Sequence, residues 1–168
     1  MDNKWGCSPL HPVVPNPYTL LSEIPERAKY FSVIYLKDAF YSVPLAEENQ
    51  FIFAFEDPTQ PASQLTWTVL PQGFRDSPHL LGQSLSQDLQ NFKSSKAVVL
   101  QYVDDILLCA ETEEACSRAS EDFLNVLAGC GYKASREKTQ LFKQSVRYLG
   151  LIVSEGTRAI GPRELNLY

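Results

Sequence analysis

The sequence predicts an α+β domain in which a mostly antiparallel sheet is backed by two helices on one face. Short runs of branched aliphatic and aromatic residues, separated by turn signals, indicate the strands. Two longer segments with apolar residues at helical spacing indicate the helices. The chain has 168 residues, of which 44% are hydrophobic, and this is enough for one domain with a substantial core.

The first predicted elements are a short helix and a strand. Asn16 offers an N-cap and Pro17 an N1 proline, so a helix is predicted that ends at Pro25. Residues 31–36 are mainly large and apolar, which is typical of a strand. The chain then turns through residues 37–40.

An aromatic hairpin is predicted next. Residues 51–55 form an aromatic run, and residues 65–70 alternate threonine with large apolar side chains. The segment between them has two prolines at 57–61, which indicates a turn. The two runs are therefore predicted to pair as strands.

Two longer helices follow. Asp76 is the predicted N-cap of the first, and Thr112 opens the second with acidic residues in its first turn. Gly129 or Gly131 ends the second helix. The apolar positions of the first are Leu81, Leu85, Leu89 and Phe92, and the inner face of the second comprises Ala115, Ala119, Phe123, Val126 and Leu127.

The most informative segment is Tyr102-Val103-Asp104-Asp105, which lies between apolar runs at 97–100 and 106–108. Both runs are typical of buried strands. Two adjacent carboxylates at such a turn are costly unless a cation lies between them. The turn also lacks Gly or Asn and contains a β-branched Val103. A locally unfavourable turn that carries two charges indicates a functional site.

The last segment is predicted to form short strands around 140–142, 146–149 and 151–153, before a turn at 155–156. The sequence shows no internal repeat and no low-complexity tract. These strands complete the antiparallel sheet of the predicted α+β domain.

Composition narrows the function classes. No stretch approaches the ~20 apolar residues of a membrane span, and the N-terminus lacks a secretory pattern, so cytosol or nucleus is the default expectation. A net charge of −5 argues against autonomous binding of nucleic acid. The cysteines show no C-x-x-C spacing, so free thiols are favoured over a disulfide or zinc, and the histidines lack ligand spacing. These residues are Cys7, Cys109, Cys116, Cys130, His11 and His79.

Seven short segments, taken in order, resemble the fingers–palm region of retroviral reverse transcriptases of the gammaretroviral and endogenous type. They cover roughly residues 11–160. They are Val14-Pro15-Asn16-Pro17-Tyr18, Leu36-Lys37-Asp38-Ala39-Phe40, Phe53-Ala54-Phe55, Gln64-Leu65-Thr66-Trp67-Thr68, Leu70-Pro71-Gln72-Gly73-Phe74, Gln101-Tyr102-Val103-Asp104-Asp105 and Tyr148-Leu149-Gly150. A lone Asp-Asp pair is weak evidence, but this ordered series is specific.

The resemblance implies a polymerase palm with part of the fingers. It also implies RNA-directed DNA polymerase chemistry with two Mg²⁺ ions, in which a primer 3′-hydroxyl attacks an incoming deoxynucleotide (dNTP) on an RNA or DNA template-primer. We expect an incomplete reverse transcriptase domain at 1–153 and the start of a truncated primer-grip or thumb at 154–168. On this reading the chain begins inside the fingers, stops before the thumb, and has no ribonuclease H domain.

Carried over residue by residue, the resemblance makes Asp104 and Asp105 the catalytic and metal-binding pair and adds Leu36 as a further metal position. The family's third carboxylate falls at Tyr35. A phenol with a pKa near ~10 is a poor Mg²⁺ ligand, and it is bulkier than a carboxylate. Asp38 belongs to a different position, and it could replace the lost ligand only if the strand shifted register or bent. The chain is therefore predicted to bind Mg²⁺ poorly and to lack useful polymerase activity.

The resemblance also implies a nucleotide site. The backbone of Asp38 and Ala39 faces the triphosphate, Phe40 is the steric gate against a 2′-hydroxyl, Gln72 contacts the sugar, and Val103 packs near the primer terminus. The hairpin from 148 to 158 corresponds to the one that grips the primer, although Ala159 stands where the family often has an aromatic residue.

Three functional hypotheses follow. The first is an inactive reverse transcriptase remnant with weak or absent binding of dNTP and template-primer. The second is a polymerase fragment whose missing parts another chain supplies. The third is a non-enzymatic interaction module that pairs with intact polymerase chains. A receiver-type phosphoacceptor domain would require repeated βα units, which the sequence lacks.

Overall fold

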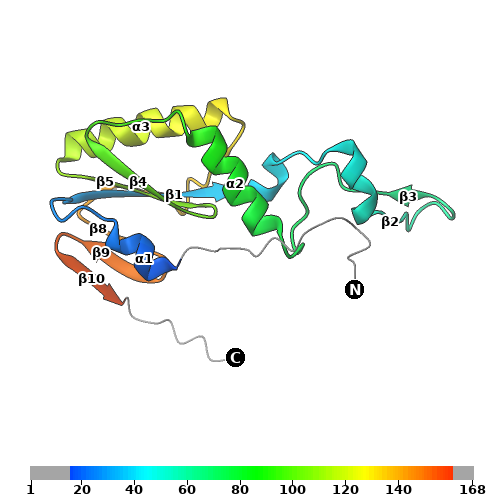
Figure 1. Cartoon of the computed structure of the whole chain (residues 1–168), viewed down its shortest axis with the longest axis horizontal. Helices are drawn as coiled ribbons and strands as arrows, with labels where there is room; N and C mark the ends of the chain where they lie inside the picture. Colours follow the sequence, from blue (N-terminus) through cyan, green and yellow to red (C-terminus); the bar gives the residue numbers. More distant parts are fainter. Residues whose placement is uncertain (1–15, 161–168) are drawn as a thin grey trace, which may run out of the picture.

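A five-stranded antiparallel sheet forms the centre of the molecule (Figure 1). The computed structural model describes residues 16–160, with side chains up to residue 156. The strand order is β4-β5-β1-β6, and β7 also pairs with β1. The strands are β1 (Tyr30–Lys37), β4 (Ala97–Tyr102), β5 (Asp105–Ala110), β6 (Lys133–Ala134) and β7 (Gln140–Lys143). The strands predicted at 31–36, 97–100 and 106–108 are thus confirmed.

Helices α2 (Ser77–Leu89) and α3 (Glu113–Gly129) cover one face of this sheet, as the sequence predicts (Figure 1). Thr112 caps α3, because its hydroxyl accepts a hydrogen bond from the Ala115 N–H at 3.2 Å. Asp76 is the N-cap residue of α2, but its side chain makes no capping hydrogen bond. The core on this face contains Ile34, Leu36, Leu81, Leu85, Ile106, Leu108, Phe123 and Leu127.

The opposite face of the sheet is covered by helix α1 (Pro17–Ser22) and by a second antiparallel sheet. That sheet consists of β8 (Ser145–Tyr148), β9 (Leu151–Ser154) and β10 (Thr157–Ile160). The predicted N-cap of α1 is confirmed, since the Asn16 side chain accepts from the Tyr18 N–H at 2.9 Å. The second core contains Leu20, Leu21, Phe31, Val33, Leu107, Val146, Tyr148 and Val153.

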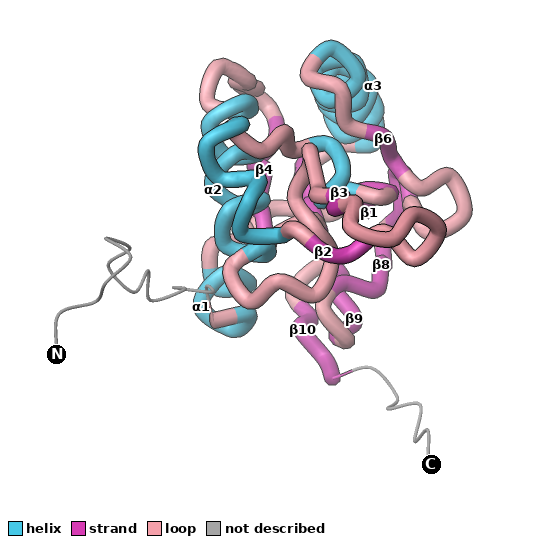
Figure 2. Tube along the Cα trace, turned by 90° about the vertical axis from the view of Figure 1, so that its right-hand side faces the viewer, coloured by secondary structure: helices cyan, strands magenta, loops and turns pink. Residues whose placement is uncertain are grey.

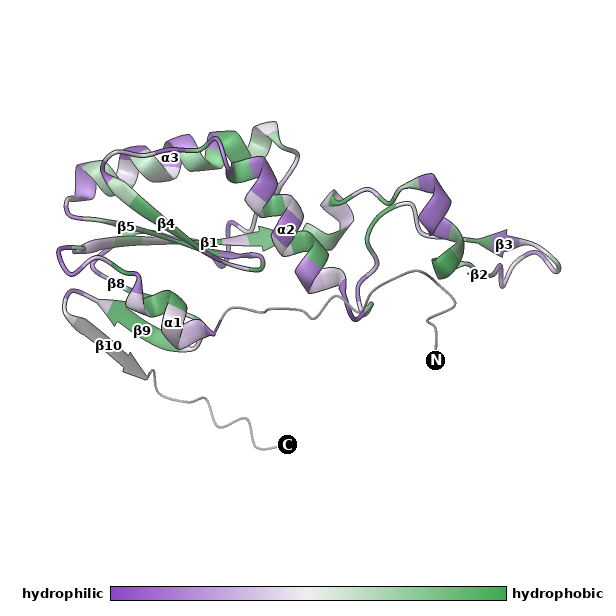
Figure 3. Cartoon of the chain, in the orientation of Figure 1, coloured by the Kyte–Doolittle hydropathy of each residue, from purple (hydrophilic) through white to green (hydrophobic). Residues whose placement is uncertain are grey.

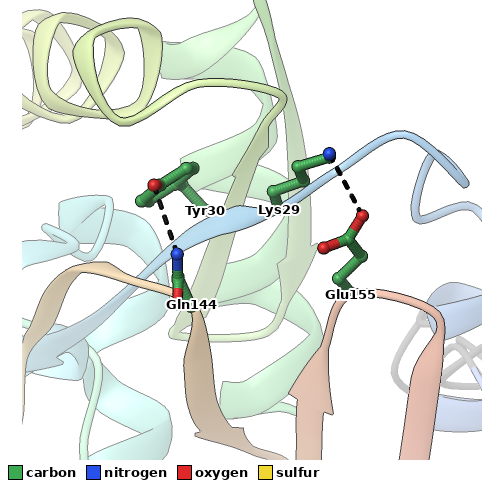
Figure 4. A network of polar contacts seen from close by, with 4 residues as sticks. All are labelled: Lys29, Tyr30, Gln144 and Glu155. Carbon is green, nitrogen blue, oxygen red and sulfur yellow. Dashed lines mark hydrogen bonds and ion pairs between the residues drawn. The ribbon is translucent and has the colours of Figure 1, made fainter.

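Polar contacts tie the start of β1 to the turns of the second sheet (Figure 4). The Lys29 ammonium lies 3.3 Å from the Glu155 carboxylate, and the Gln144 amide donates to the Tyr30 hydroxyl at 3.2 Å. Both contacts are solvent-exposed, so each contributes little to the free energy of unfolding. The apolar core between the two sheets is therefore what holds them together.

The predicted aromatic strand at 51–55 is wrong. Residues Glu47–Phe53 form a 3₁₀ helix, η2, and only Phe55–Glu56 (β2) pairs with Gln64–Leu65 (β3). This part extends away from the main sheet (Figure 1), and Phe51 is 64% exposed. An aromatic run becomes a long strand only where a partner strand continues beside it and a core covers it. Here the partner strand β3 is only two residues long, and Phe51 and Ile52 are exposed.

The remaining sequence features are placed as follows. No disulfide joins Cys109, Cys116 and Cys130, whereas Cys7 and His11 lie outside the described residues. His79 lies in the first turn of α2. Among residues 16–160, no helix is both long and apolar enough to cross a membrane.

Candidate active site at the acidic hairpin

The acidic residues lie at a tight turn between β4 and β5. Tyr102 and Asp105 are register partners, so Val103 and Asp104 alone make the turn. Val103 has φ +54°, a conformation that costs a β-branched residue roughly 1–3 kcal/mol. The Asp104 carbonyl accepts a hydrogen bond from the Leu36 N–H at 3.2 Å, which fixes the turn against β1. The poor turn chemistry seen in the sequence is therefore a strained backbone in the structure.

Asp105 is partly buried between two tyrosine-bearing strands. Its register partners are Tyr102 on β4 and Tyr35 on β1. Burial raises the pKa of Asp105 to about 6; the Asp104 carboxylate adds to the rise, and Lys138 opposes it. The Tyr148 hydroxyl donates to the backbone carbonyl of Asp105 at 3.1 Å. The backbone of Asp105 is thus fixed by Tyr148, while its side chain ionises at a higher pH than an ordinary aspartate.

Tyr35 lies directly beside Asp105, where the family resemblance places a third carboxylate. Its hydroxyl donates to the Arg147 carbonyl at 3.1 Å, and its ring packs against the core shared with β8 and β9. Burial, followed by the charge of Asp105, raises the pKa of the Tyr35 phenol above its ordinary value of 10.0. The phenol is therefore neutral at physiological pH, and its proton is engaged by a backbone carbonyl.

Asp38 does not take the place of Tyr35. It lies past the end of β1 in the left-handed conformation, with φ 52° and ψ 36°, and its side chain is exposed. Its carbonyl accepts from the Tyr41 N–H at 3.0 Å, which begins the 3₁₀ helix η1 (Ala39–Ser42). Within the described part of the chain, no three acidic, histidine or cysteine side chains come together as a metal site. Asp38 therefore does not complete a three-carboxylate set with Asp104 and Asp105.

The structure gathers several of the other predicted site residues on the helix-covered face. Leu36 and Ala39 are buried there, and Phe40 and Val103 pack against the same core. Leu36 has only its backbone carbonyl to offer a cation. Gln72 is exposed in a turn whose Gly73 has φ +90°, and the Ser77 hydroxyl braces this turn by donating to the Pro71 carbonyl at 2.8 Å. The roles predicted for these residues stay predictions.

Two parts of the site could not be found from the sequence. Lys138 lies on the 135–139 loop, and its charge lowers the pKa of Asp105, although the two residues are 33 positions apart. The loop reaches the site because the Ser135 N–H donates to the Tyr35 carbonyl at 2.7 Å. The second part is the bond from Tyr148 to Asp105. Both depend on contacts between distant segments, for which a single sequence carries no signal.

Comparison with known proteins supports the resemblance seen in the sequence. The sequence profile of the family described as reverse transcriptase (RNA-dependent DNA polymerase) matches residues 6–153. The Gag-Pol polyprotein of avian reticuloendotheliosis virus is 50% identical over 156 residues, which are 90% of this chain and 14% of the polyprotein. The Pol polyprotein of feline endogenous virus ECE1 is 48% identical over 158 residues, 91% of this chain and 15% of that protein.

A solved structure gives the same result for the fold. The foamy viral protease-reverse transcriptase in complex with an RNA/DNA hybrid superposes with a TM-score of 0.76 at 29% identity. The match covers 91% of this chain and 20% of that one. The predicted resemblance to the retroviral type and the predicted palm with part of the fingers are both confirmed.

Proposed function

Because the chain belongs to the reverse transcriptase family, we propose that it forms a reverse-transcriptase-type palm that does not support metal-dependent nucleotidyl transfer. The observation that carries the proposal is the position of Tyr35 as the register partner of Asp105. A neutral phenol bound to the Arg147 carbonyl stands where a cation would need an anionic oxygen.

The residues present do not fit a two-Mg²⁺ centre. Two cations about 3.5–4 Å apart require several shared carboxylates, and the described residues offer only the Asp104–Asp105 pair. Ionising both members costs more than ionising two ordinary carboxylates, since burial and Asp104 raise the pKa of Asp105 to about 6. Removing one electrostatic donor from an active site costs ~10²–10³ in rate, and a shared metal ligand should cost more.

Primer extension tests the proposal. The purified chain should extend a primed RNA or DNA template no faster than Asp104→Asn, in Mg²⁺ or in Mn²⁺. Extension by the wild-type chain that disappears in Asp104→Asn would overturn the proposal. Tyr35→Asp restores the third carboxylate, and a cation titration of this variant beside the wild type should show binding only in the variant.

Binding of nucleic acid and nucleotide is a separate question from catalysis. The superposed foamy viral proteins were solved with an RNA/DNA hybrid and with double-stranded DNA. We propose that the present chain binds template-primer and dNTP weakly or not at all, because its net charge is −5. Fluorescence anisotropy with a labelled hybrid at low salt measures this. Submicromolar binding at physiological salt would contradict it.

A non-enzymatic interaction module is the second candidate. Exposed apolar side chains in the segment that leaves the main sheet favour it: Phe51, Ile52, Phe55, Leu65 and Trp67. An intact reverse transcriptase polymerase chain is the partner that this hypothesis names. Co-purification of the two chains would support it, and gain of primer extension in the mixture would instead indicate a complementable polymerase fragment.

A further inference from the structure

Strand β4 lies at an open edge of the main sheet. Among the described residues it pairs only with β5, while β6 lies toward the other side of the sheet (Figure 2). Its register joins Ala97 to Ala110 and Tyr102 to Asp105. In an antiparallel pair, the backbone groups of alternate residues point toward the neighbour and away from it.

The hydrogen bonds of β5 show which backbone groups of β4 face β5 and which face away from the sheet. The carbonyls of Ala110 and Asp104 accept from β1 and the residue before it, at 2.9 Å from the Lys29 N–H and 3.2 Å from the Leu36 N–H. The backbone N–H and C=O groups of the even-numbered residues of β5 therefore point toward β1, and those of the odd-numbered residues point toward β4. Their partners on β4 are Val98, Leu100 and Tyr102. The backbone groups of Ala97, Val99 and Gln101 must then point out of the sheet.

These outward groups are largely unpaired within the described chain. The Ala97 N–H donates to the Ser94 hydroxyl at 3.1 Å. The backbone N–H and C=O groups of Val99 and Gln101 have no hydrogen-bond partner among residues 16–160. Such a row of groups is a template for pairing with another strand.

The edge also lacks the charged and proline residues that usually prevent pairing. Residues 97–102 include no charged residue and no proline, and the strand is hydrophobic along most of its length (Figure 3). Val98 is 38% exposed. Helix α2 meets β4 at Gln101, whose side-chain amide donates to the Gly82 carbonyl at 3.1 Å; the Gln101 backbone groups take no part in this contact.

We propose that β4 pairs antiparallel with β4 of a second copy of this chain, about a two-fold axis at Val99. In this register the two Val99 residues exchange hydrogen bonds, and Ala97 of each copy pairs with Gln101 of the other. The outward backbone groups at all three positions then face outward backbone groups of the other copy. The contact is isologous and closed, as expected for a homodimer.

The distribution of charge selects this partner and this direction. Lys93 and Lys96 precede β4, whereas Asp104 and Asp105 follow it. The antiparallel register places Lys96 of one copy opposite Tyr102 of the other, within reach of the second copy's Asp104. A parallel arrangement would instead set lysine against lysine. Within the described chain, ion pairs involve Lys29, Arg75 and Arg118, so the two lysines before β4 are uncommitted.

Sedimentation velocity and amide hydrogen exchange on the whole chain test the proposal. The buried area is small, so we expect a weak dimer with a Kd of roughly 10–500 μM. The Val99 and Gln101 amides should become protected as protein concentration rises, whereas the Val98 and Leu100 amides should be protected at every concentration. A monomer throughout this range, or a dimer in which Val99 and Gln101 exchange fast, would overturn the proposal.

Matched variants separate pairing from folding. Val99→Pro removes an outward N–H and no hydrogen bond of the β4–β5 ladder, so it should weaken the dimer at least ~10-fold. Lys96→Glu should weaken it ~10-fold by facing Asp104, and the double variant Lys96→Glu/Asp104→Lys should restore it. Lys133→Glu, the same charge change on β6, should have no effect. Equal effects of Lys96→Glu and Lys133→Glu would contradict pairing at this edge.

Discussion

The Tyr148 hydroxyl donates a hydrogen bond of 3.1 Å to the backbone carbonyl of Asp105, although the two residues are 43 positions apart. This bond joins the end of β8, in the second sheet, to the acidic hairpin. Tyr148 is fully buried, and burial raises the pKa of its phenol well above the ordinary value of 10.0. The hydroxyl is therefore a permanent donor, and the backbone at the candidate site depends on the core of the second sheet.

Removing this bond should destabilise the protein. Tyr148→Phe removes a side-chain donor from the Asp105 carbonyl, which still faces Tyr102 in the β4–β5 ladder, so we expect a loss of about 0.5–1.5 kcal/mol in the free energy of unfolding. Urea denaturation measures the change. Tyr18→Phe, at a 67% exposed tyrosine, is the matched control and should leave the midpoint unchanged. A Tyr148→Phe midpoint equal to wild type would show that the bond contributes nothing.

Replacing Tyr35 by aspartate should link stability to divalent cations. Tyr35→Asp adds a carboxylate beside Asp105, so without a cation the variant should melt at a lower temperature than the wild type. Mn²⁺ or Mg²⁺ should raise the melting temperature of the variant and leave that of the wild type unchanged, since only a bound ion stabilises the folded state. Thermal unfolding with EDTA and with each cation gives the comparison. If Mn²⁺ raised the melting temperature of the wild type as much as that of the variant, the proposal that Tyr35 prevents cation binding would be contradicted.

Removing only the hydroxyl of Tyr35 should have a small effect. The Arg147 carbonyl also accepts from the Gln140 side-chain amide at 2.9 Å, so in Tyr35→Phe this carbonyl keeps one donor. We expect a loss of about 0.5 kcal/mol or less in urea denaturation, below the usual value of a hydrogen bond. A loss above about 2 kcal/mol would mean that the hydroxyl has a larger structural role than the contacts indicate.

The acidic hairpin should make stability depend on pH. The pKa of Asp105 is about 6 in the folded protein, above its ordinary value of 3.8. Protonated Asp105 is thus favoured by folding, so its contribution is fully present below pH ~4 and is lost as the pH rises through about 6. Asp105→Asn should therefore melt higher than wild type at pH 8 and at the same temperature at pH 4. The difference should be modest, because solvent screens a half-exposed group.

A calorimetric series at pH 4, 6 and 8 checks this dependence. Asp122→Asn, on the exposed face of α3, serves as the control variant and should parallel the wild type throughout. Identical curves for Asp105→Asn and wild type at pH 8 would contradict the expectation.

The aromatic residues of the core and those of the exposed 3₁₀ helix η2 should contribute very differently to the free energy of unfolding. Phe123 is fully buried against the sheet and contacts Phe92 edge-to-face, with ring centroids 5.0 Å apart. Phe123→Ala should cost about 3–5 kcal/mol. Phe51→Ala, in the exposed 3₁₀ helix η2, should change the free energy of unfolding by no more than about 0.5 kcal/mol. Comparable losses in both variants would mean that residues 51–55 belong to the folded core after all.

The sequence alone determined those features whose cause is local. The 3.6-residue period and the caps predict α2 and α3, the two short apolar runs predict the hairpin around Asp104 and Asp105, and the ordered motifs predict the family. Tyr35 is also visible in the sequence, because the family motif fixes which residue type its position requires. Apart from the order of the family motifs, each of these signals lies within one continuous segment, where propensity and side-chain chemistry act directly.

The tertiary structure decided what depends on distant segments. Residues 51–53 have strand propensity, but they form a 3₁₀ helix because no neighbouring strand lies beside them. The structure also assigned the Tyr35 hydroxyl to the Arg147 carbonyl, the Tyr148 hydroxyl to Asp105, and β4 to an open edge of the sheet. A hydrogen bond or a sheet edge requires two segments to meet in space, and only the packing of the whole core determines which segments those are.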